Sequence, residues 1–590
     1  MESARGLRCV RHVVRPDGER AGESRQVDDL RISNSFYKAL PTLKNGFMQD
    51  KMCDVGAVSN TDTFIKEGAY NTETATSWSW GALKNVNYFI DGCNDPKYCT
   101  VEAETRDNYL GIARWFRAWF YYDKLTTYGE VPWFPNDIQS YQNDVMYKDR
   151  DSRDVIIRNL IADLDFAYEH IQATSSTGSA TLTRWAAAAL KSRVCLFEAA
   201  YRRYHNLTGL EITPEELYRE AAKAAKLVID NSGCSLNTAA GKKGAYRDLF
   251  YSETPLTQEV ILAVCANEKS GIFGEQNWWF NARSYGLCWS LVRSFVHTYL
   301  KQDGTPFTAA ADYAVKSFAE EMEGRDLRLE QTVRGRNFLW DGKTAVADIK
   351  NLSLTGYQVI KYTLDESKYD GGAKNINSIP LIRYAEVLLN YAEAQAELGV
   401  LTDSEWALTV GALRKRAGIT GGTETLPTTV DSYLQRTFYP DVTSPVLLEI
   451  RRERAIELVA EGMRFDDLRR WKCGSLMETL PWSGIHIPGL EQPVDVNGDG
   501  VNDYYFTEGE VASAPAAYKN IAVRVNQDGV GLYAEANPVS GYDLVYKTGA
   551  GDRYWYPDGR QYLYPIPAKV IRDYRNAGYT ISQNPEWDNE

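Results

Sequence analysis

The segment from Leu447 to Lys472, LLEIRRERAIELVAEGMRFDDLRRWK, constrains the fold more than any other part of the chain. It combines acidic residues at every fourth position, arginines, and apolar residues near helical spacing. The acidic residues are Glu449, Glu453, Glu457 and Glu461. On a helix these would be neighbours, and like charges there repel by about 0.2–0.5 kcal/mol per pair unless cations neutralise them. The arginines that can do so are Arg451, Arg452, Arg454, Arg464, Arg469 and Arg470. The pattern therefore predicts an ion-paired helix with one buried face.

Two interpretations of this glutamate row are open, a structural lattice and a carboxylate active site. A glycosidase needs two carboxylates on opposite sides of a sugar. On one helix Glu453 and Glu457 would point the same way, about 5–6 Å apart at Cβ. The arginines would also keep both ionised, whereas a general acid needs a raised pKa. The structural lattice is favoured, and a helical glycoside hydrolase that uses Glu453 or Glu457 remains the alternative.

Other chemistry is poorly supported by the sequence. None of the five histidines lies beside a Gly-x-Ser-x-Gly elbow or in a His-Glu-x-x-His helix, and no phosphate-binding glycine loop is present. The net charge of −13 argues against nucleic acid as a partner. No catalytic residues and no required cofactor are predicted.

The aromatic content is unusual, at 12% of the residues, with 38 Tyr and 15 Trp. A helical core does not need so many rings, so some are expected to face solvent or ligand. Exposed Tyr and Trp are typical of binding surfaces because each ring has a flat apolar face and a polar edge.

Long segments without helix-breaking residues predict a mainly α-helical protein. The expected helices cover residues 105–128, 151–171, 181–204, 214–230, 380–398, 404–417 and 445–472. Such helices joined by short links indicate stacked helical hairpins, as in tetratricopeptide arrays. Between them lie Gly-, Asn- and Asp-rich stretches at 251–306, 341–377 and 483–562, which are long enough to carry function or short strands.

Two aromatic clusters are the candidate ligand-binding residues. Trp78 and Trp80 lie in TSWSWGALKN, and the second cluster lies in NWWFNARSYGLCW. Rings among amide and guanidinium groups suit a sugar, whose apolar face stacks while its hydroxyls form hydrogen bonds. The second cluster contributes Trp278, Trp279, Asn281, Arg283, Tyr285 and Trp289. Core packing is the alternative for any single ring.

The segment Asp495 to Asp503, DVNGDGVND, resembles a calcium loop. Oxygen ligands at loop positions 1, 3, 5 and 9, glycine at 6 and a backbone carbonyl at 7 match that pattern, whereas position 12 is Phe506 instead of glutamate. The predicted ligands of a structural calcium are Asp495, Asn497, Asp499, the Val501 carbonyl and Asp503. The alternative is a turn built from Asn-Gly and Asp-Gly.

Nine segments, in order, resemble the SusD/RagB family of surface glycan-binding lipoproteins. They are NVNYFI from Asn85; GIARWFRAWFYYD from Gly111, running on to YGEVP from Tyr128; DGTP from Asp303; PLIRYAEVLL from Pro380; YAEA from Tyr391; LRKRAG from Leu413; EIRRER from Glu449 through EGMRFDDLRRWK from Glu461; YPIP from Tyr564; and QNPEW from Gln583. The resemblance covers residues 35 to 590.

The resemblance implies one large SusD-like fold with four tetratricopeptide-like hairpins and an irregular, loop-rich face with short strands. The corresponding regions are an atypical or disordered segment at 1–34, a helical region at 35–240, and a SusD/RagB region at 241–590 with a loop-rich insertion at about 475–562. It also implies no catalysis, capture of an oligosaccharide or polysaccharide, and delivery to a SusC-like TonB-dependent transporter at the outer face of the outer membrane. A lipid anchor is expected, although residues 1–34 show neither a signal peptide nor a lipidation motif.

Two points remain open at this stage. A helical scaffold that binds only protein, or a peptide in place of the glycan, would fit the same pattern. Cys93 and Cys99 could close a short disulfide loop or remain free thiols.

Overall fold

A computed structural model describes residues 30–44, 49–281 and 288–588. The described part is mainly helical with short strands, as predicted. The chain forms two compact units. Of the described residues, unit 1 contains 30–41, 71–233 and 557–588, and unit 2 contains 42–44, 49–70, 234–281 and 288–556. Most of the segment predicted to be atypical, residues 1–34, lies outside the described residues.

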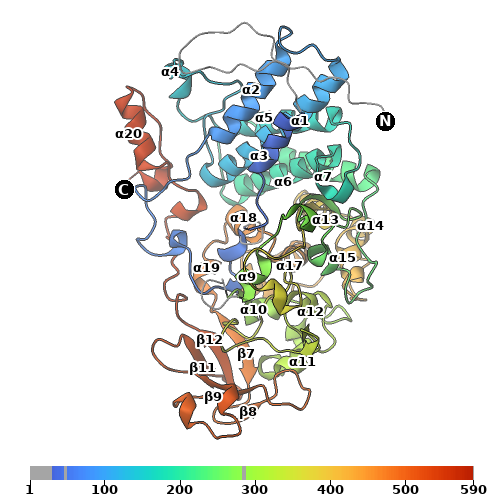
Figure 1. Cartoon of the computed structure of the whole chain (residues 1–590), viewed down its shortest axis with the longest axis vertical. Coiled ribbons are helices and arrows are strands. Elements are labelled where there is room, and N and C mark those ends of the chain that lie inside the picture. Colours follow the sequence, from blue (N-terminus) through green and yellow to red (C-terminus); the bar gives the residue numbers. More distant parts are fainter. Residues whose placement is uncertain (1–29, 45–48, 282–287, 589–590) are drawn as a thin grey trace. The chain divides into compact units, whose positions relative to one another are not determined.

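Unit 1 is built from helices that pack in chain order. The described helices are α1 (Leu30–Phe36), α2 (Gly81–Asn94), α3 (Ala103–Tyr128), α4 (Asn143–Met146), α5 (Arg153–His170), α6 (Arg184–Tyr204), α7 (Pro214–Asn231) and α20 (Ala568–Asn576). α2 packs on α3, α3 on α5, α5 on α6, and α6 on α7 (Figure 1). This packing is what stacked hairpins require, while the family count of four hairpins stays a prediction.

Local sequence explains the two tightly packed helices α6 and α7. The alanines of α6 are buried, so neighbouring helices approach closely, and the indole Nε1 of Trp115 in α3 donates to the carbonyl of Ala186 at 3.1 Å. Thr213 and Glu216 form a capping box at the start of α7, and Pro214 occupies the first helical position between them.

Unit 2 contains shorter helices. They are α8 (Asp248–Tyr251), α9 (Gln276–Asn281), α10 (Arg293–Val296), α11 (Phe318–Met322), α12 (Arg328–Thr332), α13 (Tyr384–Glu397), α14 (Asp403–Leu408), α15 (Val410–Arg416), α16 (Ser432–Phe438), α17 (Pro445–Glu457), α18 (Arg464–Arg470) and α19 (Leu476–Thr479). α13 packs on α17, which carries three of the four glutamates of the row.

The strands of unit 2 form small sheets. The strands are β1 (Gly56–Ala57), β2 (Val260–Val264), β3 (Ser290–Leu291), β4 (Leu339–Trp340), β5 (Lys343–Thr344), β6 (Ile379–Arg383), β7 (Ser483–Ile487), β8 (Pro493–Val494), β9 (Tyr504–Thr507), β10 (Ala522–Arg524), β11 (Leu532–Ala536) and β12 (Tyr542–Tyr546). The three-stranded sheets have the orders β11-β12-β7 and β10-β9-β8. Their strands β7, β8, β9, β11 and β12 are labelled in Figure 1. They lie in the insertion predicted to be loop-rich.

Three of the expected helices are wrong in part. The segment 445–472 is two helices, because Ala460 and Gly462 adopt positive φ angles of 65° and 81° and end α17. The segment 404–417 breaks at Thr409, with ψ of −94°. The segment 380–398 begins as strand β6, which pairs with β2, before α13 starts.

Candidate functional site

The side chains of Trp78 and Trp80 meet just before α2. Their ring centroids are 5.3 Å apart in an edge-to-face arrangement, and both rings are half-buried. The Trp80 ring also contacts Phe120 of α3 and Phe134, at 5.6 and 5.2 Å. Trp78 contacts Tyr128 at 4.9 Å. These contacts fix both rings while leaving part of each accessible, as a stacking platform requires.

The two tryptophans line a cavity of about 700 Å³ within unit 1. This volume falls inside the range of about 300–1,000 Å³ that is typical of small-ligand sites. Its wall combines rings and small apolar groups with amide, hydroxyl and charged groups. The lining residues are Ala75, Thr76, Trp78, Trp80, Gly81, Leu83, Lys84, Asn87, Phe134, Asn136, Asp137, Ile138, Ser140, Met146, Tyr147, Pro567, Lys569, Val570, Asp573 and Tyr574. We call it the aromatic cavity.

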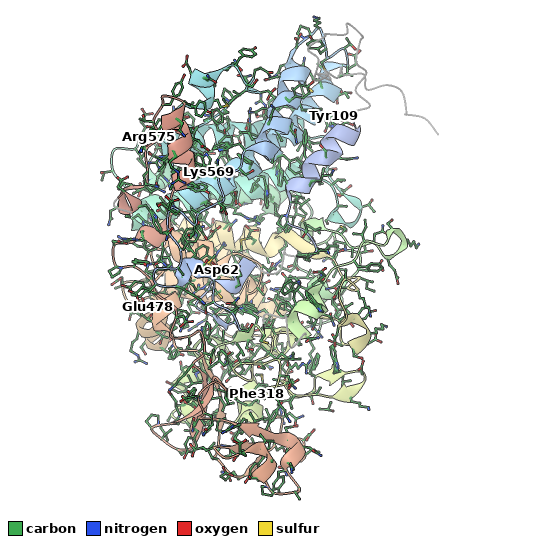
Figure 2. The ribbon with its side chains drawn as sticks, turned by 60° about the vertical axis from the view of Figure 1, so that its left-hand side comes forward. Asp62, Tyr109, Phe318, Glu478, Lys569 and Arg575 are labelled. Carbon is green, nitrogen blue, oxygen red and sulfur yellow. The ribbon has the colours of Figure 1, made fainter. Side chains whose placement is uncertain are left out.

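Its polar groups are partly held by the surrounding structure. The buried amide of Asn87 donates to the carbonyls of Phe134 and Asn136, at 2.8 and 3.1 Å. Lys569 of α20, labelled in Figure 2, pairs with Asp573 one turn later at 2.6 Å. Burial raises the pKa of the Asp137 carboxyl, although Lys84 opposes this shift. The lining carries two lysines and two aspartates, so its formal charges balance.

The second predicted cluster lies in unit 2, on α9. The rings of Trp278 and Trp279 are 4.9 Å apart, edge to face, and both are half-buried. The indole of Trp279 donates to Glu275 at 3.2 Å, and the amide of Asn281 donates to Asp370 at 3.0 Å. These rings can present a surface, but the Asn281 amide nitrogen already has a partner.

Trp289 differs from the other predicted ring residues. Only 4% of it is exposed, and it packs so closely on Gly56 that a Cβ there would lie 2.4 Å from its indole nitrogen. A ligand could stack on Trp289 only if that packing opened. Arg283 and Tyr285 lie outside the described residues.

Several residues of the aromatic cavity were missed by the sequence analysis. Phe134 and Tyr147 lie between α3 and α5, whereas Tyr574 lies on α20 near the other end of the chain. Tyr147 and Tyr574 pack edge to face with centroids 5.1 Å apart. The aromatic residues Trp133 and Phe134 could have suggested that this segment lines a binding site. They give no indication that a residue of α20 lines the same cavity.

The glutamate row is an ion-paired lattice in unit 2, as the favoured interpretation predicted. Glu457 is fully buried and pairs with Arg383 at 2.6 Å, Arg328 at 2.8 Å, and Arg416. Glu461 pairs with Lys361 and Arg383 at 2.7 and 2.6 Å.

The lattice also bears on the alternative use of Glu457 as a general acid. Burial alone would raise the pKa of Glu457, but the three guanidinium groups hold it well below its usual range. A general acid needs the opposite shift.

The loop from Asp495 to Asp503 is folded around its own carboxylates. Asp495 accepts hydrogen bonds from the backbone of Gly498 and Gly500, at 2.7 and 2.8 Å. Burial raises the pKa of Asp503, with a further contribution from Asp499 and Asp495. The described residues contain no group of three or more Asp, Glu, His or Cys side chains arranged to hold a metal ion. Asn497 and Val501 would bind calcium through an amide oxygen and a backbone carbonyl, which are not side chains of these four types. Calcium binding therefore stays a prediction.

Two further findings concern the cysteines and membrane spans. Within the described ranges, Cys93 and Cys99 are not joined in a disulfide. No described helix combines the length and apolar character needed to cross a membrane.

Comparison with known proteins gives a consistent result. The sequence profile of the SusD family matches residues 258–587, which is more than half of the chain. A SusD-like carbohydrate binding protein from Bacteroides fragilis NCTC 9343 has a similar structure, with 18% identity, coverage of 93% of this chain and 97% of that chain, and a TM-score of 0.66. A second SusD-like protein from the same strain has 21% identity, coverage of 95% and 97%, and a TM-score of 0.63. A SusD superfamily protein from Parabacteroides distasonis ATCC 8503 has 18% identity, coverage of 94% and 98%, and a TM-score of 0.55. No curated protein matches the chain.

Proposed function

The chain belongs to the SusD family, and from this premise we propose that it is a non-catalytic glycan-binding protein that holds an oligosaccharide in the aromatic cavity. The observation that carries the proposal is a cavity of about 700 Å³ lined by the half-buried rings of Trp78 and Trp80. The structural relative with the TM-score of 0.66 is described as carbohydrate binding, which supports the same ligand class.

The mechanism is stacking combined with hydrogen bonding. The apolar face of a pyranose covers an indole, while its hydroxyls meet side chains such as Asn136, Ser140 and Asp137 on the wall. Covering the accessible part of a ring contributes about 25 cal/mol per Å² of apolar surface removed from water. The balanced charges of the wall favour a glycan without net charge.

Family membership further supports a place in nutrient uptake. We propose that the protein works with a SusC-like TonB-dependent transporter at the extracellular face of the outer membrane, and delivers the glycan to it. Attachment would be through a lipid anchor. Co-purification of the full chain with such a transporter tests the partnership, and failure to associate in detergent and in native membranes would contradict it.

Removing a platform ring tests the glycan site. Trp78→Ala should weaken binding of the best hit from an oligosaccharide array about 10- to 100-fold, since each 1.4 kcal/mol corresponds to a factor of ten. Isothermal titration measures the change. Tyr141→Ala is the matched control, because Tyr141 is 80% exposed and does not line the cavity.

A second variant separates lost stacking from lost folding. Ser140 is exposed and lines the cavity, so Ser140→Trp should fill it without removing any packing. If both Trp78→Ala and Ser140→Trp bind as the unmodified chain does, the site is misplaced, and Trp278→Ala and Trp279→Ala then test the second cluster. Sustained release of reducing ends from a polysaccharide would contradict the non-catalytic assignment.

A further inference from the structure

A second, smaller cavity lies entirely within unit 2. It has a volume of about 360 Å³ and is bounded by β7, β8, the start of α11 and the turn between β11 and β12. Phe318 at the start of α11 is labelled in Figure 2. The lining residues are Val315, Ser317, Phe318, Glu320, Ile485, His486, Pro488, Pro493, Val494, Asp495, Val496, Ser540 and Gly541. We call it the histidine cavity; it shares no residue with the aromatic cavity.

The orientation of His486 is fixed by the sheet. His486 on β7 and Asp543 on β12 are register partners, and Nδ1 of the imidazole lies 2.9 Å from Oδ1 of Asp543. Asp543 also accepts from the Asn537 amide at 2.9 Å and pairs with Arg293. Burial alone would raise the pKa of Asp543, but the bond from His486 and the charge of Arg293 lower it. An ionised Asp543 requires the proton on Nδ1, so Nε2 is the acceptor in the neutral imidazole.

Nothing in the described structure uses that acceptor. Nε2 of His486 has no hydrogen-bond partner among the described residues, while its ring lines the cavity. Gly541 keeps the ring uncovered there. It has a φ of 66°, and a Cβ at this position would lie 2.8 Å from Nε2 and 2.5 Å from the carbonyl oxygen of Ile487.

The rest of the wall defines the chemistry of a ligand. Pro488 and Pro493 offer apolar surface, whereas Glu320 and Asp495 are acidic. None of the described lining residues is Lys or Arg. Such a wall accepts hydrogen bonds and repels anions. A matching ligand is rich in hydroxyl or amino donors, has an apolar face, and is small, because the volume is near the lower end for ligand sites.

We propose that the histidine cavity is a second saccharide site, which takes one neutral or amino sugar unit and accepts a hydrogen bond from one of its hydroxyls on Nε2 of His486. This goes beyond the proposed function, because it adds a site in unit 2 that excludes acidic sugars. It holds whether or not the aromatic cavity binds glycan.

The test uses ligand-observed saturation-transfer NMR on the full chain carrying Ser140→Trp, which fills the aromatic cavity. The ligands are the methyl glycosides of glucose, xylose, glucosamine and glucuronic acid. We expect saturation transfer to at least one of the glucose, xylose and glucosamine glycosides. Transfer to the glucuronic acid glycoside should be at least fivefold weaker. Adding Ser540→Trp should abolish the signal by filling the histidine cavity. Val539→Trp should preserve it, because Val539 is an exposed neighbour on the same turn that does not line the cavity.

Two substitutions of the histidine separate a binding role from a structural one. In His486→Asn the amide nitrogen can replace Nδ1 as donor to Asp543, but nothing replaces Nε2. In His486→Gln a polar atom remains near the Nε2 position. The first should lose transfer at least fivefold with an unchanged melting temperature, and the second should retain part of it. The proposal would be overturned if ligands received equal saturation transfer from the chain with His486 and from His486→Asn. It would also be overturned if Ser540→Trp left the saturation transfer unchanged, or if there were none to remove.

Discussion

At the scale of single residues, Asp50 is a buried carboxyl group whose ionised form is disfavoured by its surroundings. Its carboxylate oxygens accept hydrogen bonds from the backbone of Gly462 and Arg464, at 2.9 and 3.2 Å. Burial nevertheless raises its pKa to about 7, with a smaller contribution from Glu461, and Lys361 acts in the opposite direction. At neutral pH this group therefore titrates inside the fold of unit 2.

The sign of the resulting pH dependence follows from proton uptake. The folded chain keeps the Asp50 proton up to about pH 7, whereas the unfolded chain releases it near the ordinary value of 3.8. The stabilisation is thus fully present below the unfolded pKa and is lost as the pH rises through about 7. At about 1.4 kcal/mol per pKa unit, the whole effect is on the order of 4 kcal/mol.

We predict that Asp50→Asn removes this pH dependence. Between pH 5 and 8 the free energy of unfolding should fall less steeply in the variant, because the amide does not titrate. Denaturant titrations at several pH values measure the two slopes. Asp552→Asn is the control, because that carboxylate is largely exposed. Parallel slopes for Asp50→Asn and the unmodified chain would show that Asp50 is not the titrating group.

The lattice around Glu457 shows how far sequence reasoning reaches at this scale. The sequence predicted that the arginines of the same segment would neutralise the row. Arg452 does so by pairing with Glu449, whereas Arg454, Arg464 and Arg470 pair with Asp467, Asp54 and Glu393. The sequence could not identify Arg328, Arg383 and Arg416 as the partners of Glu457, because they belong to three other elements. The candidate site has the same limit: Trp78 and Trp80 were predicted, but Tyr147 and Tyr574 were not.

At the scale of elements, the loop from Asp495 to Asp503 has a testable role. We propose that it binds calcium weakly. Its spacing of oxygen-bearing residues matches a calcium loop, but its aspartates are not grouped around one point in the described structure and Phe506 replaces the bidentate glutamate. Weak loops of this kind have Kd values of about 10⁻⁴–10⁻³ M. Binding at 100 times Kd stabilises a fold by about 2.7 kcal/mol.

We predict that 10 mM calcium raises the melting temperature and that a chelator reverses the rise. Asp499→Ala should abolish the response, since it removes loop position 5. Asp528→Ala should respond normally, because Asp528 is an exposed residue outside the loop. Differential scanning calorimetry measures each case. If calcium has no effect on the unmodified chain, the segment is a turn.

Helix boundaries illustrate why element prediction succeeded in unit 1 and partly failed in unit 2. The long helices α3 and α5 to α7 bury aliphatic and alanine faces with clear periodicity, and their ends were predicted within a few residues. In unit 2 the periodicity continues through the break after α17, because Arg464 and Asp467 of α18 are also buried and paired. Gly462 was the only local signal for the break.

At the scale of the whole molecule, the chain leaves unit 1 after residue 233 and re-enters it at residue 557. The backbone N–H of Tyr564 donates to the carbonyl of Thr127 at 2.7 Å, and the amide of Asn584 donates to the carbonyl of Tyr128 at 3.2 Å. The sequence analysis divided the chain into contiguous regions at 35–240 and 241–590. That these regions are domains stays a prediction. Periodicity does not reveal which distant segment a terminal stretch will join.

The last turn of the chain should therefore stabilise unit 1. Trp587 is 2% exposed, and its indole donates to the carbonyls of Arg560 and Leu563 at 3.0 and 3.1 Å. We predict that Trp587→Ala costs about 3–5 kcal/mol, because it leaves a cavity and unpaired carbonyls. At about 2–4 °C per kcal/mol, the melting of unit 1 should shift down by roughly 6–20 °C. Tyr141→Ala, at an exposed position in the same unit, should melt as the unmodified chain does. Equal melting of the two variants would mean that residues 557–590 do not stabilise unit 1.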